Sequence, residues 1–579
     1  MNVEVVQRRL WEQSKQHRSL RESSTPLFPV DPYEGRVRGL MDLMHQPQWI
    51  AAACDRVLSR SRGKAAGVDR VTASEFQQNR RADLEALRLE LKRGKYRPQP
   101  LRRVMIPKSN GKQRCLGIPC LRDKIVQEVI RMALEPIYEV EFHDHSYGFR
   151  PNRSTHHAVL RCQQMMQKRF TWVIEGDVKA CFDEISHQAI LGCLREKVMD
   201  NRFLSLITRL LKAGVSIDGV VHPTEKGVPQ GGVASPLLSN VVLNKLDWFL
   251  HEQGHYGLES GYAWKAGRPN VRFVRYADDW CVFVTRGSKG YAERLRDQIR
   301  DLLTQQCGVE LSMEKTRITH VRDGFDFLGL RLRLGVGQHG TYVPKVRVPR
   351  RAITNGVRRL NEAMRWQPTQ QSGATRLVRG SAVVTGWANY YKIAHDFNRA
   401  ANTLDYHAYW IAVKALCRRY DITIAQCIRK YGRGDNLSIS GSYQLKRAQD
   451  IQMSWKQESP KPYEPGTGCY LDDVDWEAEV RQYENRQCPG RMDLKAMTLF
   501  RDGNRCRKCG TRVTLETSET DHIKPVSCFA SYAQATTLFN LQTLCLRCHK
   551  DKHNAKPSRH SGKPDAGKAC TSGLGLGPG

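Results

Sequence analysis

The amino-acid sequence predicts a multidomain protein of the α+β class, and three observations support this prediction. The chain has 579 residues, more than one hydrophobic core holds, which suggests about three to five folded units. Short runs of β-branched and aromatic residues, typical of strands, lie between longer stretches whose apolar residues recur at helical spacing. Two pairs of cysteines near the carboxyl end mark a region of different character, followed by a tail rich in Gly, Ser and Pro. We therefore expect helices and strands mixed within several domains.

The charge balance indicates a polyanionic partner. Lys and Arg number 92 against 59 Asp and Glu, which gives a net charge of +33. A field of this size costs self-repulsion unless a polyanion neutralises it, so nucleic acid is the first expectation. An anionic membrane is the weaker alternative, because no amphipathic basic helix stands out and no apolar run is long enough to span a bilayer. We expect a nucleic-acid-binding protein without a membrane partner.

The amino terminus and the cysteine content indicate in which cellular compartment the protein works. The first residues, MNVEVVQRRLWEQSKQHRSL, lack the basic and then apolar pattern of a signal peptide. The 18 cysteines in a chain of this length do not suggest a disulfide scaffold, so free thiols and metal ligands are expected. These features predict a cytoplasmic protein.

The amino-terminal part predicts helices and a basic hairpin. Gln48–Arg60 and Arg122–Tyr138 have apolar residues at helical spacing, and Thr72 with Glu75 has the spacing of a capping box. The segment between the two helices is densely basic, and Val104–Ile106 within it has the pattern of a strand that leads into a turn. Basic groups that flank a hairpin are suited to binding phosphates, whereas the alternative is a solvated charged face.

The most informative stretch is Val271–Thr285, VRFVRYADDWCVFVT. Two apolar runs flank the adjacent acids Asp278 and Asp279, a pattern that predicts a β-hairpin with both carboxylates at its tip. Neighbouring carboxylates repel, so a fold that presents them together usually holds a divalent cation; the alternative is a solvated acidic turn. Thr171–Asp177 predicts another strand, which ends in an acid that can face Asp278 across a sheet. Phosphoryl transfer from a nucleotide needs two cations roughly 3.5–4 Å apart, and Asp177 and Asp278 are the expected bridging ligands.

Gly227–Asn240, GVPQGGVASPLLSN, supplies a third part of this arrangement. Its glycines allow the backbone to approach a base pair, and Gln230 can hydrogen-bond near an incoming nucleotide. Ser235 and Pro236 are expected to begin a helix. Further along, Tyr291–Gln306 predicts an amphipathic helix, and the segment DFLGLRLRL predicts a hairpin at an edge of the same sheet.

From about Ala51 to Leu334 the chain resembles the reverse transcriptases encoded by group II introns. The motifs that carry the resemblance follow the family's order and are Ile106-Pro107-Lys108, Ser146–Pro151, Gly176–Lys179, Pro229–Gly231, Tyr276–Asp279 and Leu328-Gly329. One departure is Cys115, where the family usually has Pro. The resemblance implies the fingers and palm of a right-hand polymerase over residues 46–335, after an amino-terminal extension over residues 1–45.

The resemblance also implies roles for individual residues. Asp177, Asp278 and Asp279 would be the catalytic acids, with Mg²⁺ held by Asp177 and Asp278. The expected nucleotide-binding residues are Lys108, Arg114, Phe182, Gln230 and Lys315. In this set the two basic residues of the hairpin would contact the triphosphate. Phe182 would select deoxynucleotides by its bulk, and Lys315 would protonate the leaving pyrophosphate. The alternatives are a Phe182 ring buried in the palm core and a solvated Lys315.

Residues 336–425 are helical and basic in character and predict a thumb. Trp387, Tyr390 and Tyr391 lie among Arg and Lys, and such a mixture of π-faces and charges suits RNA; the alternative is that the aromatics form the thumb core. The string GWANYY resembles the thumb, or maturase domain X, of the same family, which implies binding of the parent intron RNA and promotion of splicing. The expected RNA-binding residues are Arg376, Arg379, Trp387, Tyr390, Tyr391 and Lys392. Residues 426–490 predict a linker or a small DNA-binding region.

Residues 491–556 predict a separate domain with its own site. Two CxxC pairs, Cys506 with Cys509 and Cys545 with Cys548, have the spacing of a structural zinc site with four Cys ligands. The remaining residues, 557–579, are rich in Gly, Ser and Pro and are expected to be disordered.

The same region resembles the HNH endonucleases with a ββα-metal fold. This resemblance implies that His522 is the general base and that Asn540 orients it. Asp521, His549 and His553 would hold one divalent ion on the scissile phosphate, and an oxygen ligand at Asp521 favours Mg²⁺. The alternative is a plain zinc ribbon with incidental histidines.

Together with these resemblances, the sequence predicts a multifunctional protein of a mobile group II intron. It would be a maturase, a reverse transcriptase that copies intron RNA by target-primed synthesis, and an endonuclease that nicks the DNA target. The expected partners are intron RNA, target DNA and deoxynucleoside triphosphates, within a ribonucleoprotein in the bacterial cytoplasm that associates with the nucleoid. The alternative is an RNA-binding splicing cofactor without active enzymatic sites, against which the intact acids Asp177, Asp278 and Asp279 argue.

Overall fold

The computed structural model contains two compact units, Met1–Arg486 and Gln487–Gly579, which are described separately. The residues that it describes are 2–23, 36–61, 66–107, 113–217, 219–229, 231–337, 340–365, 372–439, 443–454, 459–465, 498–499, 501–514, 517–523 and 540–554. Within these ranges no helix is both long enough and apolar enough to span a bilayer. The turn predicted after Val104–Ile106 and the tail at 557–579 lie outside the described residues.

The amino-terminal part of the first unit is a group of helices packed on a small sheet. The helices are α1 (Val3–Ser23), α2 (Leu40–Leu43), α3 (Pro47–Ser61), α4 (Ala73–Lys92) and α5 (Leu121–Tyr138). The predicted capping box at Thr72 and Glu75 is confirmed, because both of its reciprocal hydrogen bonds are present. The sheet has the order β2-β1-β4-β5, with β1 (Leu101–Pro107), β2 (Gln113–Ile118), β4 (Val215–Ile217) and β5 (Val220–His222). Strands β1 and β2 are the predicted basic hairpin.

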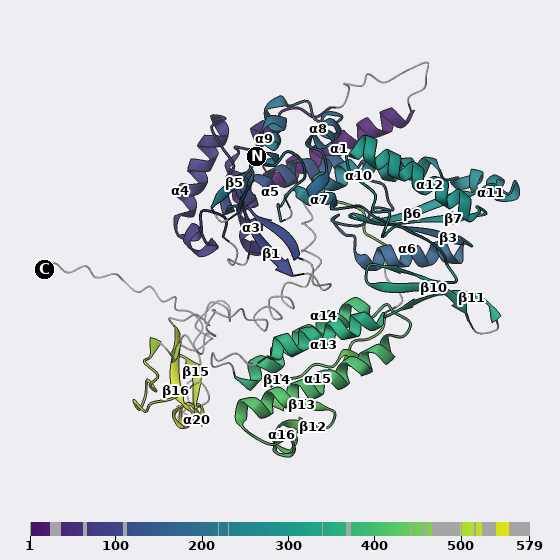
Figure 1. Cartoon of the computed structure of the whole chain (residues 1–579). Coiled ribbons are helices and arrows are strands. Elements are labelled where there is room, and N and C mark those ends of the chain that lie inside the picture. Colours follow the sequence, from purple (N-terminus) through teal and green to yellow (C-terminus); the bar gives the residue numbers. More distant parts are fainter. Residues whose placement is uncertain are drawn as a thin grey trace, which may run out of the picture. The chain divides into compact units, whose positions relative to one another are not determined.

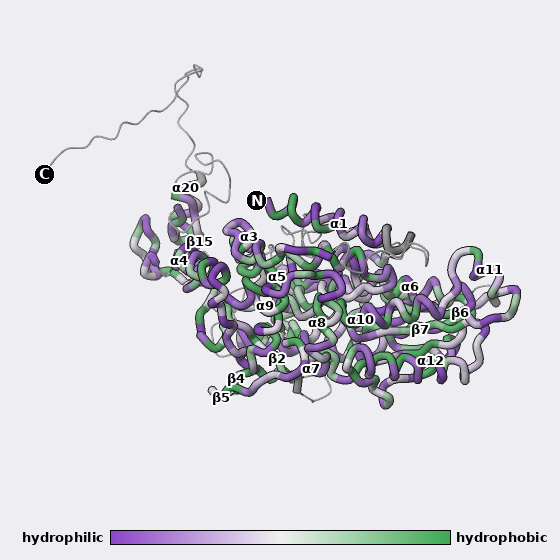
Figure 2. The backbone as a smooth tube through the Cα atoms, turned by 90° about the horizontal axis from the view of Figure 1, so that it is seen from above, coloured by the Kyte–Doolittle hydropathy of each residue, from purple (hydrophilic) through white to green (hydrophobic). Residues whose placement is uncertain are grey.

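A four-stranded antiparallel sheet, which we call the palm sheet, lies between the two hydrophobic cores of the first unit. Its order is β6-β7-β3-β8, with β3 (Trp172–Asp177), β6 (Asn270–Tyr276), β7 (Asp279–Thr285) and β8 (Arg317–His320). Along β7, Val282 and Val284 belong to one hydrophobic core, and Cys281 and Phe283 belong to another. This alternation follows from the two-residue period of a strand and means that both faces of the sheet are covered. Strand β7 is among the hydrophobic stretches of the backbone in Figure 2.

Helices cover the palm sheet on both faces. On one face lie α10 (Ser235–Glu252) and α12 (Lys289–Leu302), and on the other lies α6 (Thr155–Gln167) (Figure 1). Helix α10 begins at Ser235 with Pro236 in its first turn, as the sequence predicted. The shorter helices of this part are α7 (Cys181–Glu184), α8 (His187–Arg195), α9 (Asn201–Leu211), α11 (Gly257–Lys265) and the π-helix η1 (Leu303–Cys307).

The hairpin predicted from DFLGLRLRL is present, but it does not form an edge of the palm sheet. It belongs to a separate three-stranded sheet of order β11-β10-β9, with β9 (Phe325–Phe327), β10 (Leu330–Val336) and β11 (Tyr342–Arg347). The edge of the palm sheet is β8, which pairs with β3. Both segments have strand-like patterns, and only tertiary pairing decides which one joins the sheet.

The helices after β11 form the thumb. They are α13 (Arg350–Met364), α14 (Gly373–Tyr391), α15 (Phe397–Tyr420) and α16 (Ile424–Tyr431). The following short elements are β12 (Gly432–Arg433), β13 (Asn436–Ile439), β14 (Tyr443–Gln444) and the 3₁₀ turn η3 (Ala448–Asp450). Cys427, Leu437 and Leu445 are buried in the same core as α13–α15. The thumb boundary at residue 425 stays a prediction, and residues beyond it, up to Ala448, belong to the same hydrophobic core.

The second unit contains the predicted ββα arrangement. Strands β15 (Ser518–His522) and β16 (Leu541–Cys545) pair antiparallel, and α20 (Leu546–Asn554) follows directly. A small core of Leu499, Cys506, Val513, Leu544 and Cys548 holds this unit together. With the α/β palm and the helical thumb, this unit confirms the predicted multidomain α+β fold class.

Candidate active sites

The tip of the β6–β7 hairpin carries the adjacent acids. Tyr276 pairs with Asp279, so the loop consists of Ala277 and Asp278. Ala277 has a φ of 59°, the left-handed conformation that tight hairpin loops require at this position. Asp279 begins β7 and is the cross-strand partner of Asp177, the last residue of β3. The structure therefore brings the three predicted catalytic acids together at one end of the palm sheet, with Asp279 opposite Asp177 and Asp278 in the turn.

The charges at this end of the sheet are coupled. Partial desolvation by the surrounding protein, together with the negative charges of Asp278 and Asp177, raises the pKa of Asp279 to about 6. The ammonium Nζ of Lys315 lies 2.6 Å from Oδ2 of Asp177, and this hydrogen bond raises the pKa of Lys315. Carboxylate oxygens are the donors that Mg²⁺ prefers, and a divalent cation would offset the mutual repulsion of the acids. The donor set therefore fits such a cation.

Two glycines allow the close packing around these acids. A Cβ on Gly176 would lie 2.0 Å from Cζ2 of the buried Trp280, its cross-strand partner. A Cβ on Gly148, in the Ser146–Pro151 motif, would lie 2.2 Å from the backbone nitrogen of Ala277. At both positions a side chain would collide with the β6–β7 hairpin, so only Gly allows the hairpin to pack this closely.

The predicted nucleotide-binding residues are described in part. Phe182 is half-buried, and its ring lies 6.1 Å from that of Phe149 in an edge-to-face arrangement. The backbone nitrogen of Val228 donates to the carbonyl oxygen of Phe182 over 2.6 Å, which ties the Val-Pro-Gln-Gly segment to α7. Lys108 and Gln230 lie outside the described residues, and Arg114 is placed in β2 without a described side chain.

The predicted RNA-binding residues of α14 divide into two groups. Arg376 is 2% exposed and donates to the carbonyl oxygen of Ala415, and Trp387 is 9% exposed and donates to that of Ala352. The burial of these two side chains favours a place in the thumb core, and their contact with RNA stays a prediction. Among the remaining predicted residues, the side chains of Arg379, Tyr390, Tyr391 and Lys392 are half-buried and reach the surface.

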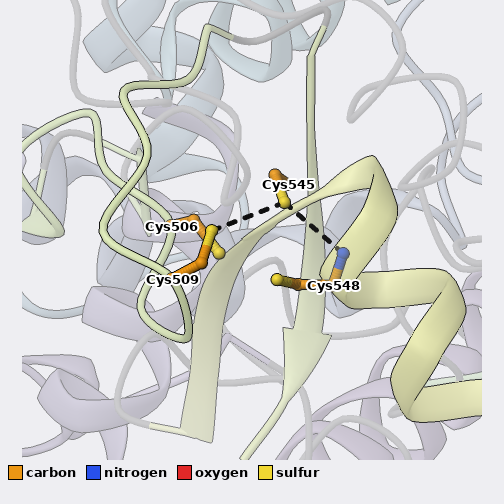
Figure 3. A group of neighbouring side chains, drawn as sticks. All are labelled: Cys506, Cys509, Cys545 and Cys548. Carbon is orange, nitrogen blue, oxygen red and sulfur yellow. Dashed lines mark hydrogen bonds between the residues drawn. The ribbon is translucent and has the colours of Figure 1, made fainter.

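The four cysteines of the two CxxC pairs, Cys506, Cys509, Cys545 and Cys548, converge on one point (Figure 3). Their sulfur atoms lie within 4.8 Å of one another, and the Sγ atoms of Cys509 and Cys545 are 3.8 Å apart. A hydrogen bond with the Thr511 hydroxyl lowers the pKa of Cys509 to about 6, whereas the neighbouring sulfurs, Cys545 first, raise that of Cys548 to about 12. Four cysteine sulfurs this close form a ready donor set for one cation, and a four-Cys set fits Zn²⁺, which would hold them as thiolates.

The predicted nuclease residues lie on β15, β16 and α20. Asp521 is 7% exposed and accepts hydrogen bonds from Lys552 Nζ and, over 3.3 Å, from Gln542 Nε2. Lys552 also donates to the carbonyl oxygen of His522 over 2.8 Å. The backbone oxygen of the buried Asn540 accepts from Ile523, which fixes its backbone one residue before β16.

Two further observations complete this site. His549 lies on α20, as predicted, whereas the side chain of His553 lies outside the described residues. Sequence reasoning missed Lys552, although its position on α20, three residues after His549, would have indicated it.

Comparison with known families extends over all three regions. The family described as "Reverse transcriptase (RNA-dependent DNA polymerase)" matches residues 106–332. "Type II intron maturase" matches residues 358–462, and "HNH endonuclease" matches residues 506–555. The maturase match extends past residue 425, in agreement with the thumb core. The fold and its sites thus define a multidomain enzyme that joins an RNA-directed DNA polymerase, an intron maturase and a DNA endonuclease.

Two relatives specify the family. The chain is 42% identical over 321 residues to "Protein YkfC" of Escherichia coli (strain K12). This alignment covers 51% of this chain and 83% of the relative. It is 28% identical over 592 residues to "Group II intron-encoded protein LtrA" of Lactococcus lactis subsp. cremoris. This second alignment covers 87% of this chain and 94% of the relative. The chain belongs to the group II intron-encoded proteins.

Proposed function

We propose that the end of the palm sheet is the polymerase centre, where Mg²⁺ held by Asp177, Asp278 and Asp279 supports the addition of deoxynucleotides to a DNA primer on an intron RNA template. The observation that carries this proposal is the register of the sheet, which sets Asp279 opposite Asp177 with Asp278 in the adjoining turn. When bound, the cations would activate the primer 3′-oxygen and neutralise the triphosphate.

The chain's own residues would then bind and orient the substrates. Lys315 is protonated at neutral pH, as an ordinary lysine is, so its Nζ can give a proton to the pyrophosphate that leaves. Its hydrogen bond to Asp177 holds it beside the acids until substrate arrives. Phe182 presents a half-buried ring near the Val-Pro-Gln-Gly segment, where its bulk would exclude a ribose 2′-hydroxyl.

We propose a second, independent centre in the ββα unit, which nicks one strand of the DNA target. His522 would take a proton from the attacking water, Asn540 would orient His522, and Asp521 with His549 and His553 would hold one divalent ion on the scissile phosphate. In the structure Lys552 neutralises the buried Asp521. A cation on Asp521 would release the Lys552 ammonium toward a phosphate. Lys552 would thus neutralise Asp521 when the cation is absent and contact the DNA when the cation is bound. The four-Cys zinc site next to these strands would keep them in register.

For the maturase activity, we propose that the surface of α14 around Arg379, Tyr390, Tyr391 and Lys392 contacts the intron RNA. Arg and Lys would pair with phosphates, and the tyrosine rings offer faces on which bases stack. The Tyr390 ring is held at its tip, since its hydroxyl donates to the carbonyl oxygen of Leu328 over 2.7 Å.

The experiment that tests the polymerase proposal is primer extension on an RNA template by the Asp278→Ala variant. We expect incorporation to be abolished while RNA affinity stays close to that of the parent, because Asp278 lies at the catalytic turn and not on the thumb. Asp301→Ala, at an exposed acid on α12, is the matched control and should extend the primer normally. Retained synthesis by Asp278→Ala would instead support a splicing cofactor whose polymerase site is unused.

A further inference from the structure

A fully buried ion pair lies directly beneath the catalytic turn. Arg275, two residues before Ala277 in the chain, and Asp247 of α10 both have 0% exposed side chains. Nε of Arg275 donates to Oδ1 of Asp247 over 2.7 Å, and Nη2 donates to Oδ2 over 2.5 Å. A bidentate pair of this kind fixes the plane of the guanidinium as well as its charge.

The same guanidinium holds the turn itself. Its Nη1 donates to the carbonyl oxygen of Ala277 over 2.9 Å and to the side-chain oxygen of Asn240 over 2.8 Å. Ala277 has the left-handed conformation, which costs a residue with a side chain about 1–2 kcal/mol. The hydrogen bond from Arg275 stabilises this conformation, and with it the position of Asp278, the next residue.

Asn240 extends the network to a second motif. It is 1% exposed, and its Nδ2 donates over 2.8 Å to the carbonyl oxygen of Gly148, whose Cα packs on the backbone of Ala277. Asn240 and Asp247 are seven residues apart on α10, so they lie on one face of the helix. Helix α10 begins four residues after Gly231, the last residue of the Val-Pro-Gln-Gly segment. One helix therefore connects the predicted nucleotide pocket, the Ser146–Pro151 loop and the catalytic turn.

The backbone of Arg275 is held from the other side. Its nitrogen donates to the carbonyl oxygen of His145 over 2.9 Å, and its carbonyl oxygen accepts from Tyr147 over 2.8 Å. The side chain and the main chain of Arg275 are thus both fixed, and neither can move without breaking several buried hydrogen bonds. Breaking a buried ion pair is strongly unfavourable, so this part of the palm has one arrangement.

We propose that Arg275, with Asp247 and Asn240, is a positioning residue that sets the geometry of the Ala277–Asp278 turn and thereby the affinity of the acids for the catalytic cation. The proposal rests on the proposed role of Asp278 as a ligand of that cation. Groups that orient metal ligands from behind typically change metal affinity or activity roughly 10- to 100-fold when they are altered.

The test is Arg275→Lys, which keeps the positive charge beside Asp247 but cannot also reach Asn240 and Ala277. Mn²⁺ binding to the full-length protein is followed by electron paramagnetic resonance, and Asp278→Ala supplies the baseline for sites other than the palm. We expect the palm site to bind Mn²⁺ about 10- to 100-fold more weakly in Arg275→Lys. The kcat of primer extension should fall by a similar factor, and the KM for nucleotide should change far less.

Two further variants separate positioning from general destabilisation. Asn240→Ala leaves the Arg275–Asp247 pair intact and should weaken Mn²⁺ binding in the same direction, even if Arg275→Lys folds poorly. Arg131→Lys is the matched control, because Arg131 is a buried arginine of α5 that forms a bidentate bond with Glu128 and a further bond with Glu135, both acids of its own helix. It should bind Mn²⁺ as the parent does, and all three variants should still nick DNA.

The outcomes distinguish this proposal from the one on which it rests. If Asp278→Ala abolishes synthesis while Arg275→Lys and Asn240→Ala bind Mn²⁺ like the parent, the positioning role is wrong and the catalytic centre stands. If Asp278→Ala itself binds Mn²⁺ and extends primers like the parent, the catalytic assignment fails first.

Discussion

The contact between Gly176 and Trp280 supports a quantitative prediction about the catalytic sheet. In Gly176→Ala the new Cβ would lie 2.0 Å from Cζ2 and 2.2 Å from Cη2 of an indole that is 1% exposed. The indole ring has no space into which it can move, so β3 and β7 must separate by up to about 1 Å. Overpacking of this kind costs about 1–3 kcal/mol, which corresponds to a fall in Tm of about 2 to 10 °C.

The same displacement reaches the chemistry, because Gly176 immediately precedes Asp177 and Trp280 immediately follows Asp279. A shift of about 1 Å in a reacting group can reduce the rate about 100-fold, so primer extension should fall by up to that factor. The assay combines thermal unfolding with single-nucleotide incorporation on an RNA template. Gly192→Ala on α8 is the control, since a Cβ there meets no atom within 4 Å and the substitution should be neutral or slightly stabilising.

A second substitution tests the cause. Trp280→Val removes the ring atoms that clash, and the double variant Gly176→Ala with Trp280→Val should lose less stability than the sum of the two single variants. Strictly additive losses, or a Gly176→Ala protein with the Tm and the incorporation rate of the parent, would refute the packing account.

Three other predictions concern separate parts of the chain. Cys506→Ser should reduce the zinc content measured by mass spectrometry to near zero, because four thiolates share the ion. The control Cys115→Ser should leave the zinc content unchanged. Equal zinc content in the two variants would contradict the four-Cys site. Burial lowers the pKa of His143 from 6.5 to about 4, and its Nδ1 accepts from the backbone of His145, so protonation breaks that bond. Its contribution of about 3 kcal/mol to stability should be present above pH 6.5 and be lost as the pH falls to 4, and His143→Gln should flatten this part of the Tm profile. The affinity for intron RNA should fall roughly 10³- to 10⁵-fold between 50 and 200 mM salt, and a flat response in filter binding would count against phosphate contacts.

Much of the fold and the centre of the site could be predicted because the signals are local. The hairpin at Val271–Thr285, the capping box at Thr72 and the paired cysteines each depend on residues close in sequence. The register between strands is different, because a shift of one residue exchanges the two faces, so the pairing of Asp177 with Asp279 could be seen only in the folded sheet.

The remaining parts depend on contacts between distant segments. Arg376 and Trp387 lie on a basic, aromatic helix that has no clear solvent face in sequence, and only the packing of α14 against α13 and α15 shows that they are buried. Arg275 and Asp247 are 28 residues apart in the sequence, and charged residues such as these usually lie on the surface. Only the folded structure shows that both side chains are buried and paired.

The most direct test of the two-centre account is target-primed synthesis on a DNA duplex by the protein purified with its co-expressed intron RNA. The parent should nick one strand and extend the new 3′ end. Asp278→Ala should nick without extension, and His522→Ala should not nick but should extend a synthetic primer on the same RNA. Extension by Asp278→Ala, or nicking by His522→Ala, would contradict the assignment of two independent centres to one chain.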